Sequence, residues 1–207
     1  MSSLLIVVSL AFDLVAGGPA PACVRQNDRL VCGFHCTSNL NQAACAQTPE
    51  GLCAATPTEV VCWDPQPDVR MIMQSRADDL PQPSCITSIN GAACGYFCER
   101  TGDEVACAAT PFGACATRFG VLRCWDPAPE VRWEMEARGE LRAASCERTL
   151  DAVACGYACV SSLKSVGCAQ TPWGRCTRSF DQIACWDPQF IVSPPAPSAS
   201  SASALAR

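Results

Sequence analysis

Nine segments of the chain share one pattern of apolar, polar and cysteine positions. Each segment begins and ends with a cysteine and has eight residues between them. The residue five after the opening cysteine is Asp, Asn or Gly in seven of the nine segments, and these residues tolerate turn conformations. The residue two before the closing cysteine is apolar in every segment: Leu30, Ala43, Val60, Ala92, Val105, Leu122, Val153, Val166 and Ile183. The pattern predicts nine short β-hairpins, each with its turn at the centre of a segment.

A two-residue turn would place the two cysteines of a segment opposite each other. At a non-hydrogen-bonded pair the Cα atoms approach to about 4.5 Å, which is within disulfide range. Because side chains alternate along a strand, we expect one face of cysteine and aliphatic residues and one polar face. A four-residue turn would favour disulfides between hairpins, and the sequence alone cannot exclude such pairings. The simplest pairing is local: Cys23–Cys32, Cys36–Cys45, Cys53–Cys62, Cys85–Cys94, Cys98–Cys107, Cys115–Cys124, Cys146–Cys155, Cys159–Cys168 and Cys176–Cys185.

The nine segments form three groups with identical cysteine spacing. The groups occupy residues 23–65, 85–127 and 146–188, and each ends in Cys-Trp-Asp-Pro. Identical spacing indicates three copies of one fold, and a copy this short is too small to be held by an apolar core alone. With 18 cysteines in 207 residues, the composition is that of a disulfide scaffold. We therefore predict a small disulfide-rich, mainly β fold of three tandem six-cysteine modules of short β-hairpins joined by short helical linkers.

The two connections between modules, 66–84 and 128–145, are related to each other. Both follow the pattern Pro-x-Pro-acid-Val-Arg and continue to a methionine four residues after the valine. Val69 and Met73, or Val131 and Met135, would share one helix face, and the acidic residue would lie in the first turn. We expect one helix of about ten residues in each connection, packed on the neighbouring modules.

The two ends of the chain lie outside the cysteine modules and differ from them in composition. Residues 1–17 contain an apolar stretch that is too short for a membrane span and is typical of a signal peptide. Residues 193–207 are rich in Pro, Ala and Ser, and we expect a disordered tail. With the cysteines, the leader predicts a secreted, periplasmic or cell-surface protein, with no membrane span once it is removed.

The repeated Trp-Asp-Pro has a structural and a functional interpretation. In the structural one, Trp63, Trp125 and Trp186 each cover the last disulfide of their module, and the aspartate caps a turn. In the functional one, an exposed tryptophan stacks on a sugar ring while the neighbouring carboxylate accepts hydrogen bonds from hydroxyl groups. Its fixed place beside a cysteine favours the structural interpretation.

The sequence lacks the residue patterns typical of metal sites, nucleic-acid binding and catalysis. The cysteine spacing does not match structural zinc sites, and the only histidine, His35, is Phe97 and Ala158 in the other modules. The sequence has no run of basic residues and a net charge of −5, so it lacks the positive charge that nucleic-acid binding requires. No nucleophile with a base, phosphate-binding loop or carboxylate pair is recognisable. We therefore expect that the protein is not an enzyme and that it binds no metal and no cofactor.

The loops between the second and third hairpins hold the candidate binding residues. These loops are 46–52, 108–114 and 169–175, and their fifth position varies: Glu50, Phe112 and Trp173. We expect these side chains to protrude and to bind a protein or glycan at the cell surface, with avidity from three linked copies. The alternative is a secreted protease inhibitor or a toxin-like small-module protein, because proline-stiffened loops between cysteines resemble inhibitor loops in length. Oligomeric state does not follow from the sequence.

The pairing of cysteines can be tested directly. Peptide mapping of the unreduced chain by mass spectrometry should recover nine linked pairs, each joining the two cysteines of one segment. A full complement of reactive thiols, or stoichiometric zinc, would contradict the disulfide scaffold.

Overall fold

The computed structural model describes residues 20–26, 29–75, 80–180 and 182–189. The predicted signal peptide and the tail from residue 193 lie outside these ranges. The described part is mainly β with two short helices, which confirms the predicted fold class.

The strands of module 1 are β1 (Ala22–Gln26), β2 (Arg29–Ser38), β3 (Ala43–Ala46), β4 (Leu52–Ala55) and β5 (Val60–Trp63). Those of module 2 are β6 (Ser84–Thr87), β7 (Ala92–Thr101), β8 (Glu104–Ala108), β9 (Ala114–Arg118) and β10 (Val121–Trp125). Those of module 3 are β11 (Ser145–Arg148), β12 (Val153–Ser161), β13 (Val166–Ala169), β14 (Arg175–Ser179) and β15 (Gln182–Trp186).

Each module consists of a three-stranded antiparallel sheet followed by a two-stranded hairpin. Every disulfide joins the two cysteines of one segment, with a sequence separation of nine residues. The cysteine Cα atoms lie 4.0–4.1 Å apart. In the first and third hairpins of each module the strand register places them directly opposite each other. No described cysteine is free.

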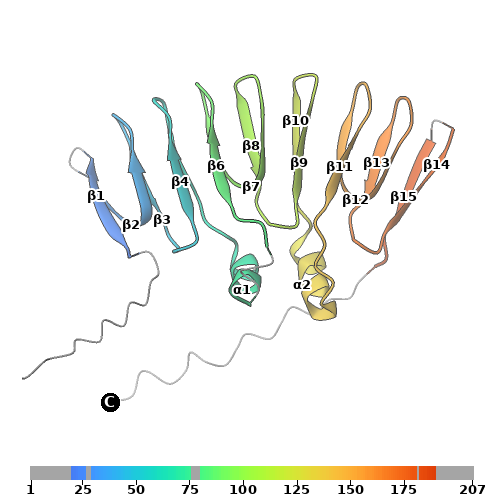
Figure 1. Ribbon diagram of the computed structural model, residues 1–207, viewed down its shortest axis with the longest axis horizontal. Helices are drawn as coiled ribbons and strands as arrows, with labels where there is room; N and C mark the ends of the chain where they lie inside the picture. Colours follow the sequence, from blue (N-terminus) through green and yellow to red (C-terminus); the bar gives the residue numbers. More distant parts are fainter. Residues whose placement is uncertain (1–19, 27–28, 76–79, 181, 190–207) are drawn as a thin grey trace, which may run out of the picture.

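The middle strand of each three-stranded sheet is interrupted by a bend. In β7 the register shifts between Tyr96 and Glu99, and Gly95 and Phe97 have φ values of 145° and 48°. A Cβ atom on Gly95 would collide with the backbone oxygen of Ala108, so only glycine fits. These bends let consecutive hairpins point the same way, and the turns of the hairpins lie along one edge of a fan (Figure 1).

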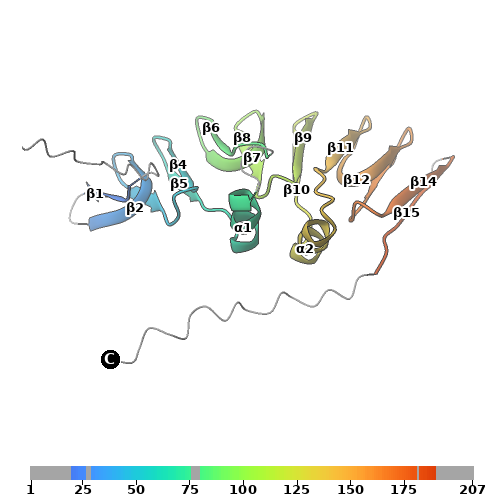
Figure 2. The ribbon, with the colours of Figure 1, turned by 60° about the horizontal axis from the view of Figure 1, so that its bottom comes forward.

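The hairpins stack face to face along the fan, as Figures 1 and 2 show. Ala114 and Ala116 of β9, on the face without cysteines, are buried against Cys155 of the next module. The expectation that each hairpin would have a polar face is therefore wrong for the β9–β10 hairpin. The reason is that the next module covers this face, where Ala114 and Ala116 replace polar residues.

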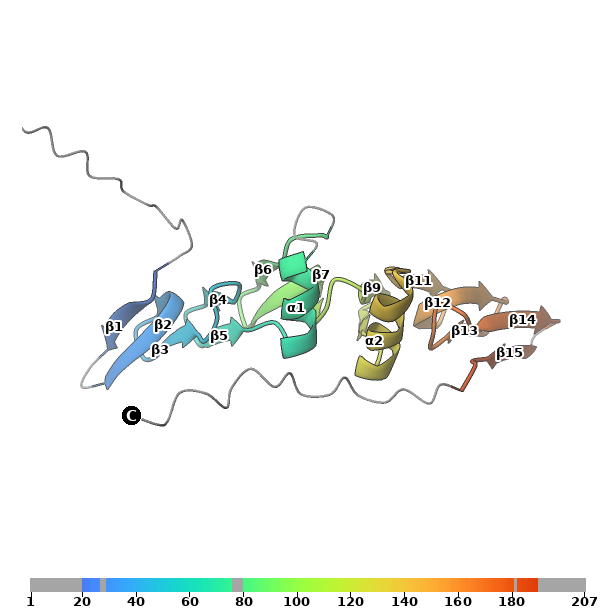
Figure 3. The same ribbon diagram turned by 90° about the horizontal axis from the view of Figure 1, so that it is seen from below.

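Two helices lie on the side of the hairpins away from the turns (Figure 1), and seen from that side they lie in front of the strands (Figure 3). They are α1 (Pro67–Ser75) and α2 (Pro129–Arg138), so each connection contains the predicted short helix. α2 begins at a proline and ends before Gly139, whose φ of 66° closes the helix in the left-handed conformation. The largest core cluster lies between the helices and the hairpins and combines residues of both connections and of two modules: Ile72, Phe112, Val131, Met135, Tyr157 and Ala169.

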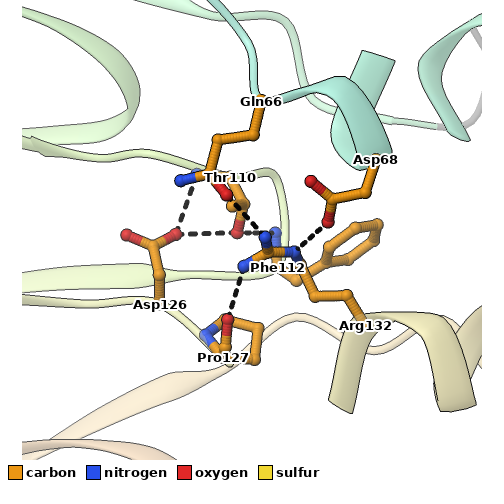
Figure 4. Close-up of polar contacts among 7 residues, drawn as sticks. All are labelled: Gln66, Asp68, Thr110, Phe112, Asp126, Pro127 and Arg132. Carbon is orange, nitrogen blue, oxygen red and sulfur yellow. Dashed lines mark hydrogen bonds and ion pairs between the residues drawn. The ribbon is translucent and has the colours of Figure 1, made fainter. Parts of the chain in front are cut away.

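A buried arginine connects the two helices. Arg132 of α2 is only 2% exposed, and its Nε donates to Asp68 of α1 at 2.6 Å. Its two terminal nitrogens donate to the Pro127 carbonyl and to the Gln66 side chain, each at 2.6 Å (Figure 4). All three guanidinium nitrogens thus have an acceptor, which a buried cation requires.

Replacing this arginine should destabilise the protein strongly. Arg132→Ala leaves Asp68 without its cation and two further acceptors without a donor, so we expect a loss of about 3 kcal/mol in unfolding free energy. The measurement is denaturant unfolding with disulfides intact, followed by tryptophan fluorescence. The matched control is Arg142→Ala, because the Arg142–Glu140 pair is largely exposed and should contribute less than about 1 kcal/mol. Equal losses would show that Arg132 does not hold the helices together.

Candidate binding surface

The aspartate of each Trp-Asp-Pro holds the loop between the second and third hairpins. Asp126 accepts hydrogen bonds from the backbone N–H groups of Ala109 and Thr110 at 2.7 and 2.8 Å, and from the Thr110 hydroxyl at 2.7 Å. Asp64 and Asp187 make the equivalent bonds in their modules. A Cβ atom on Gly113 would collide with the Asp126 carboxylate, which explains the glycine in this loop. The aspartates therefore have a structural role.

The tryptophans of the first two modules contact the following module. Trp63 meets Tyr96 and Trp125 meets Tyr157, both edge-on with ring centroids 5.5 Å apart. The idea that each tryptophan covers its own disulfide is wrong, because Trp125 and Cys124 are adjacent in one strand and point to opposite faces. The structure thus uses Trp63 and Trp125 as contacts between modules, which leaves neither ring free to stack on a sugar.

The prediction that the three candidate binding residues protrude is wrong for Phe112, which is buried in the core. Phe112 is 2% exposed and packs in the core cluster with Val131 and Met135. Trp173 is half-buried: Arg138 lies 4.3 Å above its ring, and its Nε1 donates to Glu140.

Glu50 is half-buried and lines a small cavity of about 250 Å³ together with Met73 and Leu80. The three loops all face the helices, so the expected protruding row does not form. The position varies because each loop packs against different helical residues.

In modules 2 and 3 the loop geometry also does not favour the protease-inhibitor alternative, whereas Pro49 of the module 1 loop is exposed. An inhibitor loop must be accessible to a protease, but Thr110 and Pro111 are fully buried and Thr171 is 5% exposed. The aspartate bonds described above hold the same residues from within the fold.

Among the described residues, the large apolar side chains with the highest exposure lie instead at the hairpin turns. Six of the nine segments have a large apolar residue four positions after the opening cysteine, and each is between 62% and 96% exposed: Leu40, Ile89, Phe119, Leu150, Leu163 and Phe180. The turns occupy one edge of the fan, away from the helices (Figure 1). We call these six residues the tip row. Module 3 contributes three of them, one from each of its hairpins.

Local hydrogen bonds fix the backbone beneath the tip row. The side chains of Asn39, Ser88, Thr149 and Ser162 accept backbone N–H groups of the residues that follow the apolar tip. Such turns shape the loop from within and leave the next side chain pointing outward.

Phe119 and Phe180 occupy left-handed conformations with φ of 45° and 52°. That conformation costs a bulky residue about 1 kcal/mol or more, and neither exposed ring offsets the cost by packing in the core.

The remaining chemical groups do not form a recognisable catalytic or metal site in the described part of the chain. His35 is exposed, and its Nε2 lies 3.1 Å from the Pro49 carbonyl oxygen. A shallow cavity of about 390 Å³ joins Glu59 of module 1 to Asp103 and Glu104 of module 2, but Glu59 already accepts the Ala92 N–H. No cluster of three or more potential metal ligands occurs among the described residues. No helix in the described ranges has the length and apolar character needed to cross a membrane.

No protein-family model, curated protein or solved structure matches the chain. The tip row was visible in the sequence as an apolar residue at a fixed distance from the opening cysteine, but the sequence alone does not show that the position is exposed.

The contacts between modules predict an unusual alkaline titration. The chain has two tyrosines, and both are buried. Burial raises the pKa of Tyr96 to about 12. Burial, and to a smaller extent the negative charge of Asp126, also raises the pKa of Tyr157. At pH 11 an ordinary tyrosine is about 90% ionised, whereas we expect about 10% ionisation for Tyr96 in the folded chain.

The direction in which the free energy of unfolding changes with pH follows from these pKa shifts. Each neutral tyrosine stabilises the folded state fully below pH 10, and this contribution falls as pH rises from 10 towards 12, because the unfolded chain ionises first. Tyrosinate absorbance measures the titration, with the denatured chain as the control. Ionisation of both tyrosines near pH 10 in the folded chain would contradict their burial at the module contacts.

Proposed function

We propose that the chain is a non-catalytic binding protein of an oxidising compartment outside the cytoplasm, which attaches to a partner protein through the tip row. The observation that carries the proposal is the repeated placement of a large exposed apolar residue at one edge of a rigid array. Disulfide-dense small modules are typical of extracellular proteins, and this supports the compartment.

The chemistry of the tip row favours a protein partner over a glycan. Four of its six members are aliphatic: Leu40, Ile89, Leu150 and Leu163. Aliphatic side chains fit apolar depressions on a protein, whereas sugar rings are usually held by the faces of aromatic rings. The acidic neighbours Asp103 and Asp151 and the overall charge of −5 oppose attachment to an anionic membrane surface.

The repeat explains how single weak contacts could add up. Each tip exposes only one apolar side chain, which by itself gives little affinity. Tips on the same rigid array bind together, because the first contact raises the effective concentration of the others. We therefore expect module 3, which has an apolar tip on each hairpin, to contribute most.

The test compares binding of labelled protein to intact cells of the producing organism. The triple variant Leu150→Ser, Leu163→Ser and Phe180→Ser should lower apparent affinity at least about tenfold, while any one substitution alone lowers it only a few-fold. The control is Met71→Ser, which removes an equally exposed apolar side chain from α1 and should bind normally.

Two treatments of the cells and one vesicle-binding assay distinguish the possible partners. Protease treatment of the cells should abolish binding, whereas periodate oxidation of their glycans should not. Equal binding of the triple variant and the unaltered chain would overturn the role of the tip row. Tip-dependent binding to protein-free phosphatidylcholine vesicles, or loss of binding on periodate treatment alone, would overturn the protein partner.

A further inference from the structure

The internal contacts between modules use the same pair of surfaces twice. On one side is the tryptophan at the end of a module, and on the other are the first disulfide and the joint tyrosine of the next module. At these two junctions Tyr96 and Tyr157 are 1% and 5% exposed, and Cys94 and Cys155 are 7% and 8% exposed. The junction is thus a closely packed contact that recurs along the chain.

The last hairpin presents the first of these surfaces, and no described module follows to stack on it. Trp186 of β15 lies opposite Arg175 in the same register that places Trp125 opposite Ala114 and Trp63 opposite Leu52. Trp186 is 64% exposed, whereas the other two are partly buried by the following module. A repeat array usually ends in a polar outer face, so this tryptophan is unexpected.

The first hairpin presents the second surface, which none of residues 20–26, 29–75, 80–180 and 182–189 covers in the way that Trp63 and Trp125 cover the later modules. Cys23 and Cys32 are both exposed, unlike their counterparts in modules 2 and 3, and Leu30 beside them is 67% exposed. The joint aromatic here is Phe34, which is half-buried. Both ends of the array therefore keep their half of the internal junction.

The linker-helix part of the internal junctions has no counterpart among the described residues at the two ends of the array. At the internal junctions the tyrosine hydroxyl lies 3.0 Å from the Met73 sulfur or 3.7 Å from the Met135 sulfur, each on a linker helix. The sequence after Trp186-Asp187-Pro188 lacks the Pro-acid-Val-Arg pattern of those helices. A tyrosine meeting this end would have no methionine partner, and module 1 has phenylalanine at that position.

We infer that the chain associates end to end with a second copy of itself, with Trp186 of one copy packing on Phe34 and the Cys23–Cys32 disulfide of the next. The contact continues the junction that already joins modules within the chain. It is heterologous, because two different surfaces meet, so each added copy leaves one open end of each kind.

The surroundings of Trp186 limit the strength of this contact. Arg175 and Thr177 stand where module 2 has Ala114 and Ala116, so the tryptophan is surrounded by a polar rim. We therefore expect a reversible equilibrium that shifts with protein concentration, centred on one aromatic residue.

Sedimentation velocity of the oxidised full chain over a range of concentrations tests the inference. The weight-average mass should rise with concentration beyond that of a dimer. Trp186→Ala and Phe34→Ala should each raise the dissociation constant by about 30-fold. Trp186→Phe keeps an aromatic ring and should retain most of the association. The control Phe180→Ala removes a 96% exposed ring from the turn of the same hairpin and should leave the mass unchanged.

Mixing the two deficient variants reports which surfaces meet. The Phe34→Ala chain keeps its tryptophan end and the Trp186→Ala chain keeps its disulfide end, so an equimolar mixture should form heterodimers and nothing larger. Unchanged near-ultraviolet circular dichroism and disulfide maps establish that both variants are folded.

Four results would overturn the inference. They are a concentration-independent monomer, association that survives both substitutions, loss of association in Phe180→Ala, and self-association of Phe34→Ala that depends on Trp186. None of these results bears on attachment of the tip row to a partner protein, which the cell-binding comparison measures separately.

Discussion

The cross-strand disulfide within each hairpin is the constraint on which the rest of the structure depends. By joining the two cysteines of one segment, it fixes which residue lies opposite which, and a slip of one residue would move every side chain to the other face. With the register fixed, the residue after the closing cysteine always points away from the disulfide. The tryptophans at the module ends therefore face the next module, and the stack follows from a covalent bond only a few residues away.

The modules are nevertheless not independent units. Their shared apolar cluster includes Ile72 and Met135 from the two connections, Phe112 from module 2 and Tyr157 from module 3. The aspartates hold the loops in position over this cluster, and Arg132 joins the two helices beneath it. Disulfides thus define each hairpin, while side chains from different modules and connections define how the hairpins are assembled.

The sequence predicted the local structure well and the assembly poorly. Hairpins, turns and linker helices are encoded in short spacings, such as Val131 and Met135 on one helix face, and these spacings are visible without a structure. Phe112 is buried, against expectation, because the environment of its loop comes from helices that lie elsewhere in the sequence. The prediction of a polar face on each hairpin fails for the β9–β10 hairpin for a similar reason. An isolated hairpin has one face exposed to solvent, whereas stacking covers that face with the neighbouring hairpin. The apolar tips follow a simple spacing, yet their exposure depends on all the turns pointing to one edge.

The local closure of every disulfide also determines how the array responds to tension. When the chain is pulled from its ends, force passes through each sulfur–sulfur bond and bypasses the residues of the hairpin between the two cysteines. Between Cys23 and Cys185, the segments outside the disulfide-closed hairpins are the joints, the loops held by aspartate and the linker connections, and these are the segments that can lengthen. Under load the molecule would therefore extend in short increments and keep its hairpins intact, as a stiff tether does.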